Sequence, residues 1–423
     1  MTETPAPAAA PRSLLSGWFA TPLWIRVVGA MVLGGIAGAL MGDGAKELKI
    51  VGDLFVEAIR MLVVPILFCT LAAGVVAIGS PKALGRTGGW TIGLYLASGL
   101  FAVCVGTLLG SLIQPGAGLG LTPDVPPEPR DTPTWQEALL GIVPENPVKA
   151  MVEGQALPII VFAFLFGLGL LLAEEKGKAA GDAIESAAEG LQRLTALVME
   201  LAPFGVFALM AFVIGTIGVQ ALLPLAALVG CVYLACFVYG GLVYSTFVKV
   251  VVGLPVLPFY RGMADAMAVA YATSSSNATL PVTMRCVTEN LGVPRPKASF
   301  VISLGATVNM DGTAMYLALV ATFGAQVFGV QLDPAAYAAI ILTATLGAIG
   351  AAGIPGGSFV MMPLVLGSAG IPLEVIPLIL AVDRLMDMAR TVVNVLGDGV
   401  AAVAVSKWDN ALDVDVYRGR DAA

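Results

Sequence analysis

Five long apolar runs constrain the possible folds of this chain more than any other feature of its sequence. Each run is long enough to cross the ~30 Å hydrocarbon core of a bilayer as a helix, which takes ~20 residues. They cover residues 24–42, 91–113, 155–173, 199–219 and 221–252. Of the 423 residues 58% are hydrophobic and only 12% are charged, which is not the composition of a water-soluble domain. The sequence therefore predicts an all-α integral membrane protein.

The residue types exclude several classes of function. The chain has no histidine, and its five cysteines stand singly in or beside apolar runs. Zinc, haem and histidine-based catalysis are therefore not expected, and the cysteines are interpreted as small buried hydrophobic residues. The net charge of −7 comes with no basic cluster that would indicate nucleic acid, so the lipid bilayer is the partner that composition implies.

A polar face on the last apolar helix is the strongest candidate for a functional site. The stretch 383–398, DRLMDMARTVVNVLGD, places its polar groups within an arc of about 100° when it is wound at ~100° per residue. An ionised group at bilayer depth costs roughly 2.5–3.5 kcal/mol, so this face must look into protein or a water-filled cavity, and function is its first interpretation. The alternative is a structural ion pair between Asp387 and Arg390, which leaves much of the face unexplained. The face comprises Asp383, Asp387, Arg390, Thr391, Asn394 and Asp398.

Two apolar segments in the C-terminal part are interrupted by Ser, Gly and Pro. They contain TSSSNATLP at 273–281 and GAIGAAGIPGGS at 347–358. Each is followed by a predicted span that is rich in polar residues, and the first of these spans carries NMDGT at 309–313. Pro281 precedes Asp311 by 30 residues and Pro355 precedes Asp387 by 32, which is an internal repeat of form. Non-helical chain at membrane depth survives only where it is buried or lines a cavity, so both interruptions are predicted to be tips of re-entrant hairpins. Paired broken segments of this kind indicate the central site of a transporter.

The connections carry further expectations. Residues 1–20 form a tail without the features of a cleaved leader, residues 114–135 form a Pro-rich exposed loop, and residues 174–186, EEKGKAAGDAIES, form a charged connection. Lys and Arg are more frequent in one set of alternate loops than in the other, and the positive-inside rule then places both termini in the cytoplasm.

Three motifs together, TSSSNATLP, NMDGT and DMARTVVNVLGD, closely resemble those of the glutamate transporter family, the dicarboxylate/amino acid:cation symporters. The resemblance covers nearly the whole chain. It implies a homotrimer in the cell inner membrane, with eight transmembrane helices and two re-entrant helical hairpins per subunit in an inverted-repeat transporter fold. Residues 21–256 would be mainly scaffold, except that the spans near 91–113 and 221–252 join the transport domain. The transport core would be 257–407, comprising a hairpin at 257–289, a span at 297–325, a hairpin at 332–371 and a span at 374–407, followed by a cytoplasmic tail at 408–423.

The resemblance also implies roles toward an acidic amino acid substrate. Its α-carboxylate would meet the first hairpin tip and Asn394, its amino group Asp387 and Thr391, and its side-chain carboxylate Arg390 and Thr313. A planar guanidinium suits a carboxylate, and an acid nearby suits an ammonium group. The substrate residues implied are Ser275, Ser276, Thr313, Ile354, Gly356, Asp387, Arg390, Thr391 and Asn394.

Co-transported sodium ions would occupy three further sites. One is implied at Asp398 with Asn394, Asn309 and the Gly305 carbonyl. A second is formed by Thr307, Met310 and the carbonyls of Ala348, Ile349 and Ala351, and a third by Tyr95, Ser98, Asn309 and Asp311. Hard carboxylate and carbonyl oxygens suit an alkali cation better than nitrogen or sulfur would.

The chain departs from the family at several positions. Gly99 stands where the family usually has a second hydroxyl of the third cation site, and no arginine occurs in the first hairpin tip. Met388 stands where animal members carry a second arginine, and Leu317 where proton-coupled animal members carry a glutamate.

These features predict a secondary transporter and not an enzyme: a sodium-driven symporter of aspartate or glutamate with an elevator-type cycle. The alternatives are a C4-dicarboxylate or neutral amino acid:cation symporter and a proton-coupled glutamate transporter. Two other classes are a channel and an intramembrane enzyme that uses Asp311 and Asp387 as a catalytic pair. A channel is disfavoured because its filter is usually ringed by identical subunits and not built from two unlike hairpins in one chain. The aspartyl enzyme is disfavoured because the chain lacks a second acid motif of matching form.

Overall fold

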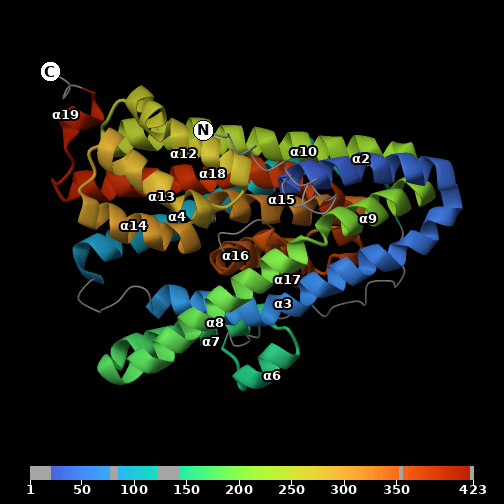
Figure 1. The fold of residues 1–423 in the computed structure, drawn as a ribbon, viewed down its shortest axis with the longest axis horizontal. Helices are drawn as coiled ribbons and strands as arrows, with labels where there is room; N and C mark the ends of the chain where they lie inside the picture. Colours follow the sequence, from blue (N-terminus) through green and yellow to red (C-terminus); the bar gives the residue numbers. More distant parts are fainter. Residues whose placement is uncertain (1–20, 77–83, 122–142, 352–355, 420–423) are drawn as a thin grey trace, which may run out of the picture.

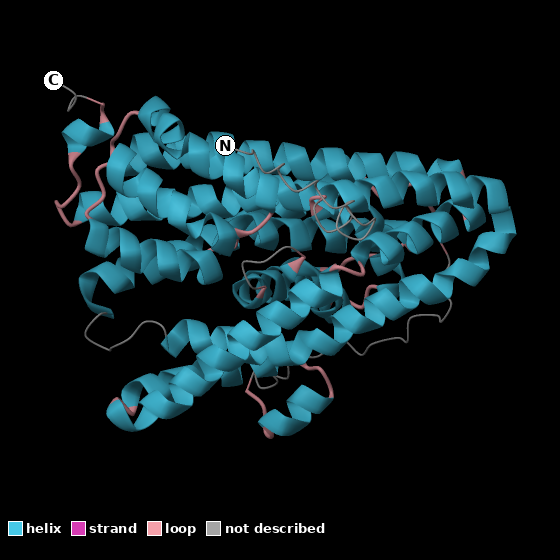
Figure 2. Cartoon of the chain, viewed as in Figure 1, coloured by secondary structure: helices cyan, strands magenta, loops and turns pink. Residues whose placement is uncertain are grey.

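The computed structural model describes residues 21–76, 84–121, 143–351 and 356–419. All regular structure in these ranges is helical, as Figure 2 shows, which confirms the predicted all-α class. By length and composition, four helices there could cross a membrane, or five if one bent pair counts as a single span. The protein is therefore a multi-pass membrane protein, while the predicted total of eight spans stays a prediction.

The first helices follow the predicted apolar runs. Helix α2 (Leu23–Met41) leads through the short helix η1 (Gly42–Leu48) into α3 (Lys49–Val76), and η2 (Leu84–Gly88) precedes α4 (Gly89–Ile113). Helix α2 packs along α9 (Ala202–Thr216). At Gly34 and Gly38 a side chain would collide with the backbone of Phe207 and Ala211 on α9, so the two glycines permit the close approach of these helices.

The predicted charged connection at 174–186 is wrong. After α6 (Pro147–Val152) and α7 (Ala156–Leu172), that segment begins the 25-residue helix α8 (Glu175–Met199). Ala, Glu and Lys are strong helix formers, and one face of α8 is apolar enough to pack on α3. A bend of 50° separates α8 from α9.

The run at 221–252 forms one long helical rod. It comprises η3 (Val219–Ala221), α10 (Leu222–Phe237), η4 (Val238–Val243), α11 (Tyr244–Thr246) and η5 (Phe247–Val252). The wider turns at η4 and η5 are local π-type adjustments, which occur often where side chains serve a site. Tyr239 and Tyr244 lie in this region, and their hydroxyls donate to the Ser98 carbonyl and to the Asp311 carboxylate.

The C-terminal part contains both predicted helical hairpins. The first is α12 (Val256–Thr273) and α13 (Ser276–Arg285), continued by η6 (Cys286–Asn290), and the second is α16 (Pro334–Gly350) and α17 (Gly357–Ser368). The first turns at Ser274, which has a left-handed φ of 52°, and Ser275 caps α13 by accepting a hydrogen bond from the Ala278 N–H at 3.1 Å. Residues 352–355 of the second tip lie outside the described residues.

The span predicted at 297–325 is broken in its middle. Helix α14 (Arg295–Val308) ends before Asn309, and α15 (Asp311–Val327) begins after Met310. Neither residue of the break is Gly or Pro, and the Asp-Gly pair that directly follows it, at 311–312, is the turn signal the sequence offers there. Contacts from the last long helix hold the break open, as described below.

That last helix, α18 (Ile376–Trp408), is the centre of the structure. It follows η7 (Leu373–Val375) and precedes α19 (Val414–Tyr417). Its most apolar window is 94% buried, against 28–47% in the other three candidate spans, so α18 is enclosed by protein where they face outward. Figure 1 shows it among α4, α10, α12, α14 and α15, with α3 and α8 crossing obliquely to one side.

Candidate functional site

The polar face of α18 is buried along its whole length. Asp383 and Arg390 are at most 1% exposed, and every predicted member of the face is buried. The Arg390 Nη1 and Nη2 atoms bind both oxygens of Asp383 at 2.9 and 3.1 Å. Its Nε binds Asp387 Oδ1 at 3.0 Å, so all three guanidinium nitrogens contact a carboxylate.

Tyr316 on α15 completes this cluster. Its ring lies 3.9 Å from Arg390 Cζ, in cation–π geometry, and its hydroxyl donates to Asp383. The ion pair that the sequence offered as an alternative is therefore present, but it is larger than Asp387 and Arg390 alone. A substrate carboxylate at Arg390 would have to share the guanidinium with Asp383 or displace it.

Asp387 joins α18 to both hairpins. Its Oδ2 accepts the Gly356 N–H at 3.1 Å and lies 3.4 Å from Arg384 Nη1, while Arg384 Nη2 lies 3.5 Å from the Thr273 carbonyl of the first hairpin. The Thr391 hydroxyl donates to the Asp387 carbonyl at 2.8 Å. The Asp387 carboxylate thus contacts the second hairpin directly and the first hairpin through Arg384.

Asn394 caps the start of α15. Its Oδ1 accepts the N–H groups of Gly312 and Thr313 at 2.8 and 3.4 Å, and its Nδ2 donates to Thr313 Oγ1 and Met310 Sδ, both at 3.3 Å. The first N–H groups of a helix have no partner within it, so this side chain stabilises a helix start in the middle of a span.

A small polar cavity lies between the two hairpin tips and α18. It brings together five predicted substrate residues: Ser276, Thr313, Asp387, Thr391 and Asn394. Met310, Ala351, Ser274, Gly357 and Ser358 also line it. Gly356 donates its N–H to Asp387, which lines the cavity, and Ser275 serves as a helix cap. Ile354 is outside the described residues.

Two hydroxyl groups in this cavity were not predicted. Ser274 and Ser358 are 2% and 4% exposed, and neither Oγ has a hydrogen-bond partner among the described residues. A buried polar group without a partner costs free energy, so both hydroxyls are suited to a polar ligand. Their only signal in the sequence was their place in the two interruptions, one in TSSSN and one in GGS.

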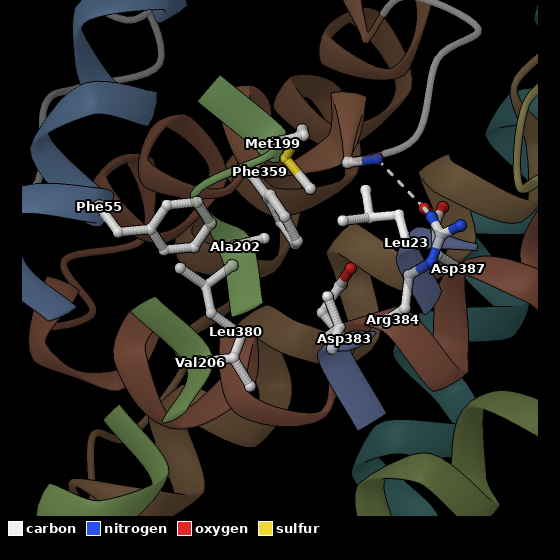
Figure 3. A pocket seen from close by; sticks show the side chains of 12 residues that line it. Leu23, Phe55, Met199, Ala202, Val206, Phe359, Leu380, Asp383, Arg384 and Asp387 are labelled. Atoms are coloured by element: carbon white, nitrogen blue, oxygen red, sulfur yellow. Dashed lines mark hydrogen bonds and ion pairs between the residues drawn. The ribbon is translucent and has the colours of Figure 1, made fainter. Parts of the chain in front are cut away.

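A second, more apolar cavity separates α18 from the first helices. Figure 3 shows Phe55 and Met199 from the first helices, Phe359 from the second hairpin, and Arg384 and Asp387 from α18 around this cavity. The remaining lining residues are Leu23, Val27, Ala202, Val206, Gly356, Leu380 and Asp383. The lining comes from α2, α3, α8 and α9 on one side and from the second hairpin and α18 on the other.

Oxygen atoms suited to a cation gather at the break between α14 and α15. Asp311 Oδ2 accepts from Tyr244 at 2.6 Å and from Ser98, while Asn309 Nδ2 donates to Asp398 Oδ1 at 3.0 Å. Asp311 Oδ1 and Asn309 Oδ1 are buried acceptors without a partner among the described residues. Such oxygens fit a sodium ion, which would supply the missing positive charge.

Two glycines lie next to these acids, and only Gly305 is required by close packing. A side chain at Gly305 would collide with Asp398 Oδ1 and the Tyr95 hydroxyl, which donates to the Val301 carbonyl at 2.9 Å. A Cβ at Gly99 would instead lie 3.7 Å from Asp311 Oδ1. Gly99 therefore faces the unpartnered oxygen of Asp311. It stands at the position where the resemblance implies that the family usually has a hydroxyl group.

Of the second predicted set of cation ligands, the structure places two at the polar cavity. Met310 and Ala351 line it, and the Ala348 carbonyl accepts the Ala351 N–H at 3.1 Å. Thr307 Oγ1 donates to the Leu304 carbonyl at 3.0 Å, and Ile349 is half-buried on α16. Among the described residues no three acidic or cysteine side chains converge.

Comparison with known proteins identifies the family. The model of the sodium:dicarboxylate symporter family matches residues 23–408. A proton/sodium-glutamate symport protein of Geobacillus stearothermophilus is 36% identical over 91% of this chain and 94% of its own. A proton/glutamate-aspartate symporter of Escherichia coli (strain K12) is 36% identical over 92% of this chain and 93% of its own. A C4-dicarboxylate transport protein of Laribacter hongkongensis is 34% identical over 93% of this chain and 91% of its own. The chain therefore belongs to the sodium:dicarboxylate symporter family and is a secondary transporter, not an enzyme.

Proposed function

We propose that this protein carries aspartate or glutamate across the cell inner membrane together with sodium ions. The polar cavity between the hairpin tips is the observation that supports this most. It offers an acid for an ammonium group in Asp387, and hydroxyl and amide groups for carboxylates in Ser274, Ser358 and Asn394. Relatives named for glutamate and aspartate transport support the same substrate class.

Arg390 would recognise the side-chain carboxylate of the substrate. Its guanidinium presents N–H groups in a planar fork, and this geometry matches a carboxylate in a bidentate contact. Because Asp383 already occupies that fork, binding would exchange one carboxylate for another and keep the arginine neutralised. Arg390 would stay paired throughout, and the displaced Asp383 would keep its hydrogen bond from the Tyr316 hydroxyl.

Sodium would bind at the acids around the α14–α15 break. A cation beside Asp311, Asn309 and Asp398 would pair with the acceptors that now lack a partner and would stiffen the break that Asn394 caps. Since Asn394 also lines the polar cavity, cation binding and substrate binding would act on one side chain. Two ligands that favour one arrangement of a shared group bind cooperatively, and this is the physical basis of symport.

The transport step would be an elevator movement. The hairpins, α14, α15 and α18 would move as a transport domain with α4 and the 219–252 rod, against a scaffold that includes α2, α3, α8 and α9. The apolar cavity of Figure 3 lies along this boundary, and most of the side chains that line it are apolar. The homotrimer, the eight spans, the re-entrant hairpins and the cytoplasmic termini belong to the same proposal.

Uptake by reconstituted protein tests the proposed function. Proteoliposomes with an inward sodium gradient should accumulate labelled L-aspartate or L-glutamate in a saturable way, and unlabelled L-aspartate should compete. Vesicles with equal sodium on both sides and empty vesicles are the controls. Absence of sodium-dependent accumulation of either amino acid would contradict the proposal.

A C4-dicarboxylate is the second candidate substrate. A relative of similar identity is named for C4-dicarboxylate transport, and such a substrate shares both carboxylates with aspartate. It lacks the ammonium group that would use Asp387. Uptake of labelled succinate in the same vesicles decides whether it is a substrate.

A further inference from the structure

Arg384 is a second buried arginine at the edge of the site. It lies on α18 three residues before Asp387 and is 8% exposed. Figure 3 shows its side chain beside Asp387 on the wall of the apolar cavity. A guanidinium in such a place needs an electrostatic partner, because a buried charge without one is strongly destabilising.

The contacts of Arg384 are weak compared with those of Arg390. Its Nη1 lies 3.4 Å from Asp387 Oδ2, its Nη2 lies 3.5 Å from the Thr273 carbonyl, and its Nε has no partner among the described residues. All three nitrogens of Arg390, in contrast, lie within 3.1 Å of a carboxylate oxygen. Arg384 is therefore the loosely held cation of the pair.

The charges of this cluster balance only when Arg384 is counted. Asp383 and Asp387 contribute two negative charges, and Arg384 and Arg390 contribute two positive ones. Without Arg384 the cluster would carry one net negative charge. An arriving dianion would meet that charge in a region of low polarity, where Coulomb repulsion is much stronger than in water.

We propose that Arg384 is a displaceable counter-charge of Asp387 that sets the preference between substrates with and without an ammonium group. The inference rests on the proposed function. When an amino acid binds, its ammonium group takes the place of Arg384 on Asp387 Oδ2. When a dicarboxylate without an amino group binds, Arg384 stays on Asp387 and keeps that acid neutralised. Arg384 is thus a positioning residue that acts through Asp387.

Removing the charge of Arg384 should therefore affect the two substrates unequally. In Arg384→Gln the side chain stays polar, but Asp387 loses one counter-charge. Aspartate brings an ammonium group that replaces it, whereas succinate brings none. The preference for aspartate over succinate should rise at least about tenfold, which corresponds to about 1.4 kcal/mol.

The experiment measures apparent affinities for labelled aspartate and labelled succinate in proteoliposomes with a fixed sodium gradient. Arg384→Lys keeps the charge and should keep the parent preference. Arg384→Gln combined with Asp387→Asn should show the same preference as Asp387→Asn alone, because Arg384 acts only through that acid. Arg26→Gln is the matched control, since Arg26 is equally buried but pairs with Glu200 at 2.7 Å; it should leave the preference unchanged.

Several results would overturn the inference. Equal loss of both substrates in Arg384→Gln would mean that the arginine only braces the first hairpin through Thr273. A further change of preference when Arg384→Gln is added to Asp387→Asn would mean that it acts elsewhere, and this comparison stays decisive if the single variant does not fold. A parent protein that takes up neither substrate would contradict the proposed function itself, which distinguishes the two failures.

Discussion

At the scale of single residues, Arg390 is neutralised before any substrate arrives. Asp383 holds it through two hydrogen bonds, Asp387 through a third, and Tyr316 covers its face. Removing one partner of a buried ion pair typically costs about 3–5 kcal/mol, because the other charge is left uncompensated. Arg390 therefore has a structural task as well as its proposed recognition task.

Arg390→Cys should abolish aspartate uptake and permit uptake of a neutral amino acid such as serine, because the fork for the side-chain carboxylate is gone. It should also lower stability by about 3 kcal/mol through the unpaired Asp383. Adding Asp383→Asn should restore stability but not aspartate uptake. Thermal unfolding and uptake of both labelled amino acids measure the two effects. Aspartate transport by the stable double variant would show that Arg390 does not recognise the substrate.

Gly99 offers a gain-of-function test at the residue scale. A serine there fits, because its Cβ would lie 3.7 Å from Asp311 Oδ1 and 4.0 Å from Thr345 Cγ2, which are ordinary contacts. Its hydroxyl would give the unpartnered oxygen of Asp311 a neighbour that can also coordinate sodium. Gly99→Ser should lower the sodium concentration needed for half-maximal uptake several-fold. An unchanged sodium dependence would separate Gly99 from cation binding.

Residue identities were predictable from sequence where motifs carry them, but partners were not. Asp383 was recognised as part of the polar face, yet its bond to Arg390 seven residues later depends on rotamers. Ser274 and Ser358 became candidates only when burial showed that their hydroxyls lack partners. Such facts depend on packing between distant segments, which periodicity does not encode.

At the scale of helices, the break between α14 and α15 organises the proposed cation sites. Gly305 packs directly against Asp398 and Tyr95 on one side of the break. Gly305→Ala should push these groups apart, at a cost of roughly 1–3 kcal/mol, and should strongly weaken sodium-dependent uptake. Gly230→Ala is the matched control, because Gly230 on α10 has open space where the methyl group would lie. Equal sodium dependence in both variants would contradict the placement of a cation site at Gly305.

A polar cluster joins the ends of three helices outside the apolar part of the protein. Asp409, just after α18, accepts hydrogen bonds from Lys297 on α14 and from Thr87 at 2.6 Å, and these contacts hold the pKa of its carboxyl below the usual range. A lowered folded-state pKa means that the stabilisation is present above the usual pKa and is lost as the pH falls through the lowered one.

Asp409→Asn should therefore destabilise the protein at pH 7 by at most about 1 kcal/mol, since solvent screens part of the pair. The difference between parent and variant should shrink when both are measured near pH 3. Thermal unfolding in detergent at the two pH values provides the comparison. A difference of the same size at both would mean that packing, not the ionised carboxylate, stabilises this end of α18.

The sequence predicted helices better than their interruptions. Apolar runs located α2, α4 and α7 within a few residues, and Ser, Gly and Pro located both hairpins. Helix α8 was missed because its charges were interpreted as a loop, although Ala, Glu and Lys favour a helix. The break at Asn309 was missed because the cap that supports it, Asn394, comes from another helix 85 residues later.

At the scale of the whole molecule, α18 connects every proposed task. Its face contacts the second hairpin through Asp387, the start of α15 through Asn394 and the acids at the break through Asp398. It also borders the apolar cavity along which we propose that the transport domain moves. Family membership and the all-helical class followed from the sequence, whereas assembly and movement concern contacts between chains and between states.

Coupling to sodium is the central claim of the proposed function. The acids in and around the site are Asp311, Asp383, Asp387 and Asp398. Asp383 is paired with Arg390, and each of the other three is proposed to hold a cation or the ammonium group of the substrate. A nearby positive charge keeps a carboxylate ionised, and with Leu317 in place of an acid and no histidine in the chain, no group remains to carry a proton.

The most direct test is uptake of labelled aspartate into proteoliposomes under one gradient at a time. We expect concentrative uptake with an inward sodium gradient at equal pH on both sides, and none in sodium-free vesicles with only an inward proton gradient. Concentrative uptake driven by the pH gradient without sodium would contradict sodium coupling and would mean that one of these four carboxylates carries a proton.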